Sequence, residues 1–374
     1  MWMRFCLSAT LVFAISSCSD DPARPDSDPE SESDPAAVSQ EIVSWLQANS
    51  HSFTTSEAGS GLDDLQFLKE MVGDARVVSL GEATHGTREF FQMKHRVLEF
   101  LVKEMDFNLF AIEATWPESN LVNDYVHGGD GDPAVLLSGL YFWTWNTQEV
   151  LDMILWMRAH NGAPGDDPPV SFLGFDIQFP GLAIRNVIEY LEAVDPPAAD
   201  HAFDLYGCMR PFANGPSGFP GTFGSYRDQG RVYQDNCVPD ILTVQDSLLA
   251  HETEYTTVSS VEEFARAARS ARMVIQFEDM ASSRTDGARD RYMAENAIWL
   301  LDQAGPEAKI VLWAHNGHVA DSPTSFVAGS MGYHLQQHYG DEMVIAGFDF
   351  YQGGFQAITQ SSSGTYTGLD EHSV

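Results

Sequence analysis

Short apolar runs alternate with longer amphipathic segments along most of this chain. In the longer segments, apolar residues recur at helical spacing, as they do from Thr87 to Met105. The short runs predict buried β-strands at residues 76–80, 108–112, 170–175, 309–314 and 343–348. Nearly continuous apolar strands separated by helices are typical of a parallel sheet buried on both sides. The pattern therefore predicts an α/β fold, with a mainly parallel sheet and helices on both faces.

One long segment departs from this alternation. Residues 199–281 contain no comparable strand, and they include a long helical pattern from Ser260 to Ala281. We predict a helical insertion or cap there. Because no low-complexity break follows residue 39, we expect residues 39–374 to form one domain that includes the insertion.

The first residues have the pattern of an export signal. Arg4 precedes an apolar run from Phe5 to Ile15, which is shorter than the ~20 residues that a membrane-spanning helix needs. Small residues then lead to Cys18, an arrangement that resembles a bacterial lipoprotein signal. We predict a signal peptide at 1–17, lipidation at Cys18 and an acidic disordered tether at 18–38, rich in Asp, Glu, Ser and Pro. The expected location is the cell envelope, periplasmic or surface, with the lipid in a membrane; ordinary secretion with an incidental Cys18 is the alternative.

Export also bears on the remaining cysteines. Once the signal is removed and Cys18 is lipidated, Cys208 and Cys237 are the pair that remains. Disulfides persist in oxidising compartments, so we expect these two residues to be bonded. Two buried free thiols are the alternative.

The net charge excludes one class of partner. The sequence has 20 Lys and Arg against 54 Asp and Glu, a formal net charge of -34. Such a surface repels phosphate backbones, and no nucleic-acid partner is expected.

Titratable residues follow four of the five predicted strands. Ligands of open α/β sheets bind beyond the carboxyl ends of the strands, so these side chains are expected to gather at one edge. They are Glu82 and His85 after the first strand, then Glu113, Asp176, and the pair His315 and His318.

The chemistry of this set suits the activation of water. Imidazole has an ordinary pKa near ~6.5, so His85 can take a proton from water when Glu82 and Glu113 stabilise the imidazolium. A hydrolase also needs donors for the oxyanion, and the second histidine pair, or Lys94 and Arg289, are the candidates. The other histidines, among them His95 and His201, have no comparable context, and we expect surface or satisfied core positions for them.

Other catalytic designs fit less well. Glu82, His85, His315 and His318 also supply the mixed nitrogen and oxygen ligands that Zn²⁺ or Mn²⁺ accepts, and this alternative stays open. The sequence has neither the H-E-x-x-H motif of zinc proteases nor the G-x-S-x-G or S-x-x-K motifs of serine enzymes. We therefore do not expect a serine hydrolase.

Five ordered motifs carry a resemblance to a known family. LGEATHGTREFFQMKHRVLEFL, FAIEA, LGFDIQ, ARDRYMAEN and WAHNGHV occur in this order. Over about Val77 to Phe355, the protein resembles the erythromycin esterase family. The resemblance implies hydrolysis of an ester or lactone by histidine-activated water, without a covalent intermediate and without the fold of the serine hydrolases.

The resemblance also implies roles for single residues. It assigns the general base to His85, the partner carboxylates to Glu82 and Glu113, and the second histidine pair to His315 and His318. Lys94 matches a basic position of the first helix, and the Arg-Asp motif of the late helix is matched at 289 and 290. We assign substrate binding to Lys94, Asp176, Arg289 and Asp290.

The sequence therefore predicts an envelope hydrolase with a small-molecule ester or lactone as substrate and no obligatory cofactor. A membrane anchor is not what an intracellular antibiotic-inactivating enzyme requires, so we do not transfer macrolide specificity. Two alternatives remain: a metal-dependent envelope hydrolase that uses the same Glu and His residues, and a non-catalytic lipoprotein that binds a ligand in the cleft.

Overall fold

A computed structural model describes most of the protein beyond the predicted signal. The described residues are 35–164, 168–213, 226–282, 287–324, 328–360 and 366–373. Cys18 and the predicted signal peptide lie outside them. Helix α1 (Pro35–Asn49) begins inside the predicted tether, so the end of that segment is helical. It belongs to a unit, Met1–His51, that is separate from the body formed by Ser52–Val374.

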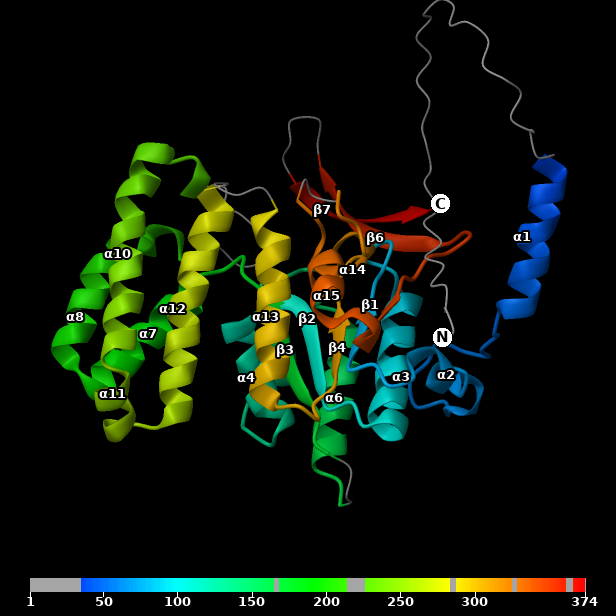
Figure 1. Ribbon diagram of the computed structural model, residues 1–374, viewed down its shortest axis with the longest axis horizontal. Coiled ribbons are helices and arrows are strands. Elements are labelled where there is room, and N and C mark those ends of the chain that lie inside the picture. The colour runs from blue at the N-terminus through cyan, green and yellow to red at the C-terminus, as the bar shows by residue number, and fades with distance from the viewer. Residues whose placement is uncertain are drawn as a thin grey trace, which may run out of the picture. The chain divides into compact units, whose positions relative to one another are not determined.

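The body is organised around a five-stranded parallel sheet, as the apolar runs predict. Its strand order is β3-β2-β4-β1-β5, and all of the neighbouring strands are parallel. Figure 1 shows β2, β3 and β4 side by side in the middle of the body. The strands are β1 (Val77–Leu80), β2 (Leu109–Thr115), β3 (Ser171–Asp176), β4 (Ile310–Trp313) and β5 (Met343–Ala346).

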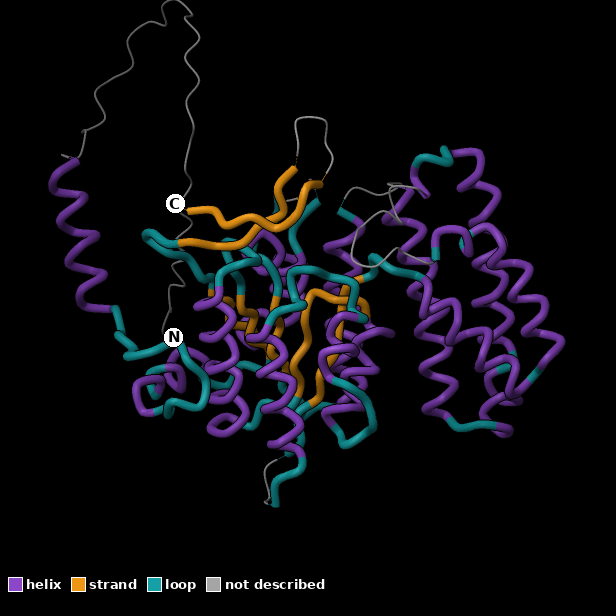
Figure 2. The backbone as a smooth tube through the Cα atoms, turned by 180° about the vertical axis from the view of Figure 1, so that it is seen from behind, coloured by secondary structure: helices purple, strands orange, loops and turns teal. Residues whose placement is uncertain are grey.

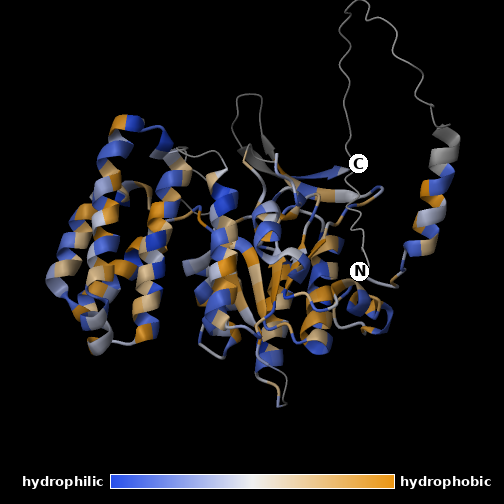
Figure 3. Cartoon of the chain, in the orientation of Figure 1, coloured by the Kyte–Doolittle hydropathy of each residue, from blue (hydrophilic) through white to orange (hydrophobic). Residues whose placement is uncertain are grey.

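Helices cover both faces of the sheet, which confirms the predicted fold class. Successive strand residues point to opposite faces. Val78 and Phe110 pack with α3 (Arg88–Met105) and α6 (Gln148–Asn161), whereas Val77 and Leu109 pack with α13 (Ala288–Ala304) and α15 (Met331–Tyr339). The strands lie between helices in Figure 2, and Figure 3 shows that they are the most hydrophobic part of the protein. Two apolar cores therefore hold the sheet between them.

A group of helices lies beside the sheet, at the left of Figure 1. It begins at Gly181, earlier than the start of the predicted insertion at residue 199, because α7 packs mainly against α8 and α12. Cys208 and Cys237 form the expected disulfide, with Cα atoms 5.7 Å apart. The helices are α7 (Gly181–Val194), α8 (Pro196–Leu205), α10 (Arg231–Ala250), α11 (Glu252–Val258) and α12 (Val261–Ser282).

Shorter elements complete the described part of the protein. They are η1 (Asp63–Leu65), α2 (Leu68–Val72), α4 (Trp116–Val126), α5 (Pro133–Ser138), η2 (Tyr206–Cys208), η3 (Arg210–Phe212), α14 (Asn316–Val319) and η4 (Gly340–Glu342). Within the described ranges, no helix is both long enough and apolar enough to cross a membrane.

An antiparallel hairpin near the end of the sequence lies against the loop that follows β1. It consists of β6 (Gly354–Gln360) and β7 (Tyr366–Ser373). The Gln356 amide donates a hydrogen bond to the Gly86 carbonyl, at 3.0 Å. A Cβ atom at Gly86 would lie 1.8 Å from the Gln356 carbonyl oxygen, so only glycine permits this approach. The hairpin thereby becomes a wall of the region around His85.

Candidate active site

The loop after β1 holds a buried carboxylate with three hydrogen-bond partners. Glu82 has no exposed surface. One carboxylate oxygen, Oε1, lies 2.7 Å from Nδ1 of His85, and the other accepts from Lys94 Nζ at 2.7 Å and Trp313 Nε1 at 2.8 Å. Because a carboxylate only accepts, Nδ1 of His85 carries the hydrogen, and its Nε2 carries the lone pair.

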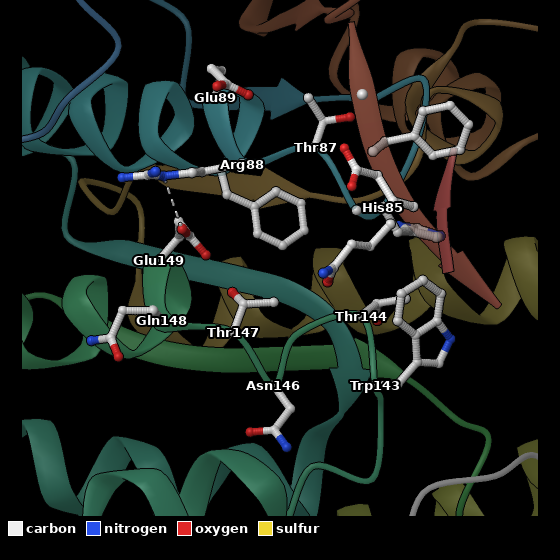
Figure 4. A pocket seen from close by; sticks show the side chains of 16 residues that line it. His85, Thr87, Arg88, Glu89, Trp143, Thr144, Asn146, Thr147, Gln148 and Glu149 are labelled. Carbon is white, nitrogen blue, oxygen red and sulfur yellow. Dashed lines mark ion pairs between the residues drawn. The ribbon is translucent and has the colours of Figure 1, made fainter. Parts of the chain in front are cut away.

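His85 lines a cavity of about 460 Å³. The walls come from the loop and first turn of α3 (residues 86–89 and Phe91), the segment before and at the start of α6 (residues 143–144 and 146–149), and both strands of the hairpin (Figure 4). The His85 side chain is 26% exposed, although its carboxylate partner is completely buried. The buried Glu82 thus holds the imidazole in place, while part of the ring is accessible from the cavity.

The surroundings of His85 change its proton affinity. Burial is the largest single influence and lowers the pKa, but the hydrogen bond to Glu82 and the charges of Glu113 and Glu82 together raise the pKa of His85 above its ordinary value. A raised pKa makes this imidazole a stronger base than histidine in water.

The second histidine loop lies next to the first. The ring centroids of His85 and His315 are 5.2 Å apart. His315 Nδ1 accepts from the Gly317 amide at 3.0 Å, and its Nε2 therefore donates to the Ala83 carbonyl, at 3.1 Å. The backbone thus occupies both ring nitrogens of His315. Burial, followed by the neighbouring His85, lowers the pKa of His315.

Arg289 connects the ends of two neighbouring strands. Its Nε and one terminal nitrogen bind both Asp176 oxygens, at 3.1 and 2.7 Å, and that terminal nitrogen also lies 2.6 Å from Glu113 Oε1. Although burial lowers it, the charges of Asp176 and Glu113 raise the pKa of Arg289. Burial alone would raise the pKa of Glu113, but His318 and Arg289 hold it at about 2.

His318 joins the same network from α14. Its Nδ1 lies 2.7 Å from Asp290 Oδ1, which also accepts from the Met331 amide. Its Nε2 lies 3.1 Å from a terminal nitrogen of Arg289 and 3.5 Å from Glu113 Oε1, and its Nδ1 donates to Asp290 because a carboxylate only accepts. Glu113 links this network to the other histidine, because its second oxygen accepts from the His315 amide at 3.2 Å.

The structure gathers the predicted site residues at the carboxyl end of the sheet, but it does not expose them equally. His85 lines the described cavity. Lys94 and Asp176 have no exposed surface, and Asp290 is almost completely buried. These three side chains bind Glu82, Arg289 and His318, respectively. Their position is that of supports behind the cavity wall, which differs from the direct substrate contact expected from the sequence.

The four predicted metal ligands do not form a ligand set. Among the described residues, no group of three or more His, Cys, Asp or Glu side chains is arranged to hold a metal ion. Lys94, Trp313 and His85 occupy the oxygens of Glu82, and backbone groups occupy the ring nitrogens of His315. Of these donors, Nε2 of His85 is left for a ligand, and a single nitrogen does not make a metal site.

Sequence reasoning missed a hydroxyl in the cavity wall. Thr144 lines the cavity, and its buried Oγ1 has no hydrogen-bond partner within the part of the protein that the structure describes. No motif marks this threonine. Its neighbours Trp143 and Trp145 were the available signal: Trp143 lines the cavity, whereas Trp145 is a core residue that lies edge-on to His85, with centroids 5.4 Å apart.

Comparisons with known proteins agree with this fold and with the five motifs. The family model described as "Erythromycin esterase" matches residues 102–368. This range begins after the G-E-x-x-H motif and extends past Phe355, so it is shifted from the range of Val77 to Phe355 expected from the motifs. The protein belongs to the erythromycin esterase family.

Individual relatives are distant but align with most of the sequence. Erythromycin esterase type II of Escherichia coli is 24% identical over 84% of this chain and 78% of its own length. The putative hydrolase YbfO of Bacillus subtilis is 23% identical over 83% and 72%. A Bacillus cereus protein of known structure superposes with a TM-score of 0.75 at 30% identity, over 88% of this chain and 78% of its own.

The fold is also that of a named esterase. A mutant of the erythromycin esterase EreC in its open conformation has a TM-score of 0.69, at 17% identity, over 84% of this chain and 79% of its own. The homologues indicate a hydrolase of the esterase type.

Proposed function

We propose that this protein hydrolyses carboxylic esters or lactones with a water molecule activated by His85. The observation that carries the proposal is the pair formed by His85 and the buried Glu82. The carboxylate fixes the tautomer that leaves the Nε2 lone pair for a water molecule, and the raised pKa makes that lone pair more basic.

The reaction requires no covalent intermediate. Nε2 of His85 takes one proton from water while the water oxygen forms a bond to the carbonyl carbon. The resulting tetrahedral intermediate breaks its bond to the alcohol oxygen, which receives the proton from the imidazolium. The products are an acid and an alcohol or, from a lactone, one hydroxy acid.

Thr144 is our candidate donor to the substrate oxyanion. Thr144 lines the cavity that His85 lines, and its buried Oγ1 is unpartnered among the described residues. A hydroxyl held without a partner is ready to donate where negative charge develops. We expect Thr144→Val to lower kcat by about tenfold or more, whereas Thr243→Val, at an exposed position of α10 outside the cavity lining, should leave kcat unchanged.

The buried residues act as positioning residues in this proposal. Lys94 holds Glu82, Asp176 holds Arg289, and Asp290 holds His318. His315 fixes the Ala83 carbonyl in the loop that carries His85. None of these side chains needs to touch substrate.

The test is hydrolysis of p-nitrophenyl alkanoates and a lactone panel by the purified protein. His85→Ala should lower kcat by ~10² or more, the scale of general-base catalysis. His201→Ala, an exposed histidine on α8, is the matched control and should keep full activity. Equal rates in the wild type and the His85 variant would refute the proposal.

We also propose that the protein is lipid-anchored in the bacterial cell envelope through Cys18. The support is the signal-like segment that ends at this cysteine. Membrane fractionation of cells that express the full-length protein tests it. The wild type should sediment with membranes and Cys18→Ser should not; the same distribution for both would contradict the anchor.

A further inference from the structure

A second pocket lies next to the His85 cavity, between α3, α6 and the loop at residues 57–59. Its volume is about 400 Å³. Four carboxylates line it, and neither Lys nor Arg is among its lining residues. We call it the acidic pocket; its principal residues are Glu57, His95, Glu99, Glu149, Asp152 and Trp156.

The acidic pocket adjoins the His85 cavity, and residues of both α3 and α6 line each of them. Glu149 lines both pockets, and its Oε1 lies 3.4 Å from Nε of Arg88 at the boundary between them (Figure 4). His95 follows Arg88 by two turns of α3, which is about 10 Å at the rise of an α-helix. Because Glu149 lines both pockets, a ligand that occupies the His85 cavity and extends past Glu149 enters the acidic pocket.

His95 supplies an observation that is independent of the carboxylates. It is 6% exposed, and its Nε2 is buried without a hydrogen-bond partner among the described residues. The sequence led us to expect a satisfied core or surface histidine, and this one is not satisfied. A buried polar atom without a partner has lost its hydration and gained nothing in return, so a ligand that bonds to it gains affinity.

The state of this imidazole suits a donor ligand. Burial lowers the pKa of His95 to about 4, so the ring is neutral at neutral pH and can accept a hydrogen bond. Asp152 opposes this shift and Lys103 adds to it. Lys103 is not a lining residue; its ammonium lies 5.7 Å from the Trp156 ring centroid. A protonated amine would find carboxylates for its charge and a neutral imidazole for one N–H.

We propose that the acidic pocket binds an organic ammonium group, and that it thereby favours esters whose amine is on a chain long enough to pass from the His85 cavity beyond Glu149. The second part rests on the proposed esterase function, and the first does not. A metal ion is a poor occupant because, within the described residues, these side chains are not arranged as a ligand set.

Binding is tested first, without catalysis, by calorimetric titration with n-butylammonium. The variant Glu57→Gln/Asp152→Asn removes two charges and keeps the shape of the side chains. Exposed charges contribute modestly, so we expect Kd to rise by about threefold to tenfold. The matched control, Glu70→Gln/Asp302→Asn, removes the same two charges outside the acidic pocket and should leave Kd unchanged.

Three results would overturn the binding site. They are an unchanged Kd in the pocket variant, an equal loss in the control variant, and equally tight binding of the neutral n-butanol. Circular dichroism and melting temperatures establish that each variant is folded before it is titrated.

Selectivity is tested separately, with two p-nitrophenyl esters. One has an ω-amino group on an acyl chain long enough to extend past Glu149, and the other ends in a methyl group at that position. We expect a several-fold higher kcat/KM for the amino ester, which high salt and the pocket variant reduce. No preference, with binding intact, would overturn the selectivity. A His85→Ala variant with full activity would refute the esterase mechanism and leave the ammonium site standing.

Discussion

The two histidine loops look alike in sequence and differ in the structure. Each follows a buried strand and places two polar side chains three residues apart beside glycine. In the first, a buried carboxylate holds one nitrogen of His85, and the ring is exposed to a cavity. In the second, the backbone holds both nitrogens of His315, and Asp290 and Arg289 hold His318. Hydrogen-bond partners, more than spacing, separate a catalytic candidate from its supports.

The largest expected effect comes from Glu82→Gln in the first loop. It removes the charge that orients His85 and leaves Lys94, which has no exposed surface, without its carboxylate. We expect kcat to fall by ~10² and the free energy of unfolding by about 3–5 kcal/mol. Ester assays and denaturant titrations measure both.

The double variant Glu82→Gln/Lys94→Met is the control for this change. It should recover stability, because no buried charge remains, and it should not recover kcat. If activity returned together with stability, the carboxylate would have no role beyond neutralising Lys94.

The second loop is tested by Arg289→Met. The change leaves Glu113 and Asp176 buried without their shared cation. We expect a loss of about 3 kcal/mol in the free energy of unfolding, against less than ~0.5 kcal/mol for Arg266→Met on the exposed face of α12. Equal losses would mean that the buried network adds nothing.

The pH dependence of hydrolysis distinguishes the two loops, because the pKa of His85 is raised and the pKa of His315 is lowered. A general base must be unprotonated, so kcat/KM should rise with pH through the pKa of His85, which is above its ordinary value. Because Glu82 raises that pKa, Glu82→Gln should move the rise of kcat/KM to lower pH, by about one unit. If the rise stays at the same pH, a group other than His85 causes it.

The same raised pKa affects stability. Protonated His85 stabilises the fold most below its unfolded pKa, and this contribution disappears as the pH rises through the folded pKa. The free energy of unfolding, measured by chemical denaturation, should therefore fall slightly as the pH rises through neutrality. The His85→Ala variant should not show this fall.

The smallest effect is expected from His315→Gln. Both of its ring nitrogens bond to backbone groups of the two loops, and an amide side chain can likewise donate and accept there. We expect a change in kcat of less than about tenfold, compared with ~10² for His85→Gln. Equal losses would show that His315 takes part in the chemistry.

Much of the fold was readable from the sequence. The five apolar runs became the five parallel strands because continuous burial on both faces leaves little choice of residue type. The β6–β7 hairpin was not predicted, since it depends on a backbone contact between Gly86 and Gln356. The helical group also begins earlier than expected, because α7 packs on α8 and α12, and the apolar pattern of α7 does not identify these partners.

The candidate residues were likewise readable, but their roles were not. The sequence by itself determined which side chains stand at the strand ends, because parallel strands finish at one edge of a sheet. Only the tertiary structure decided that His85 faces a cavity and that Lys94, Asp176 and Asp290 are buried behind it. It also decided that Thr144 Oγ1 and His95 Nε2 lack hydrogen-bond partners among the described residues. The exposure and the hydrogen-bond partners of a side chain depend on segments that are distant in the sequence. The local sequence pattern therefore does not predict them.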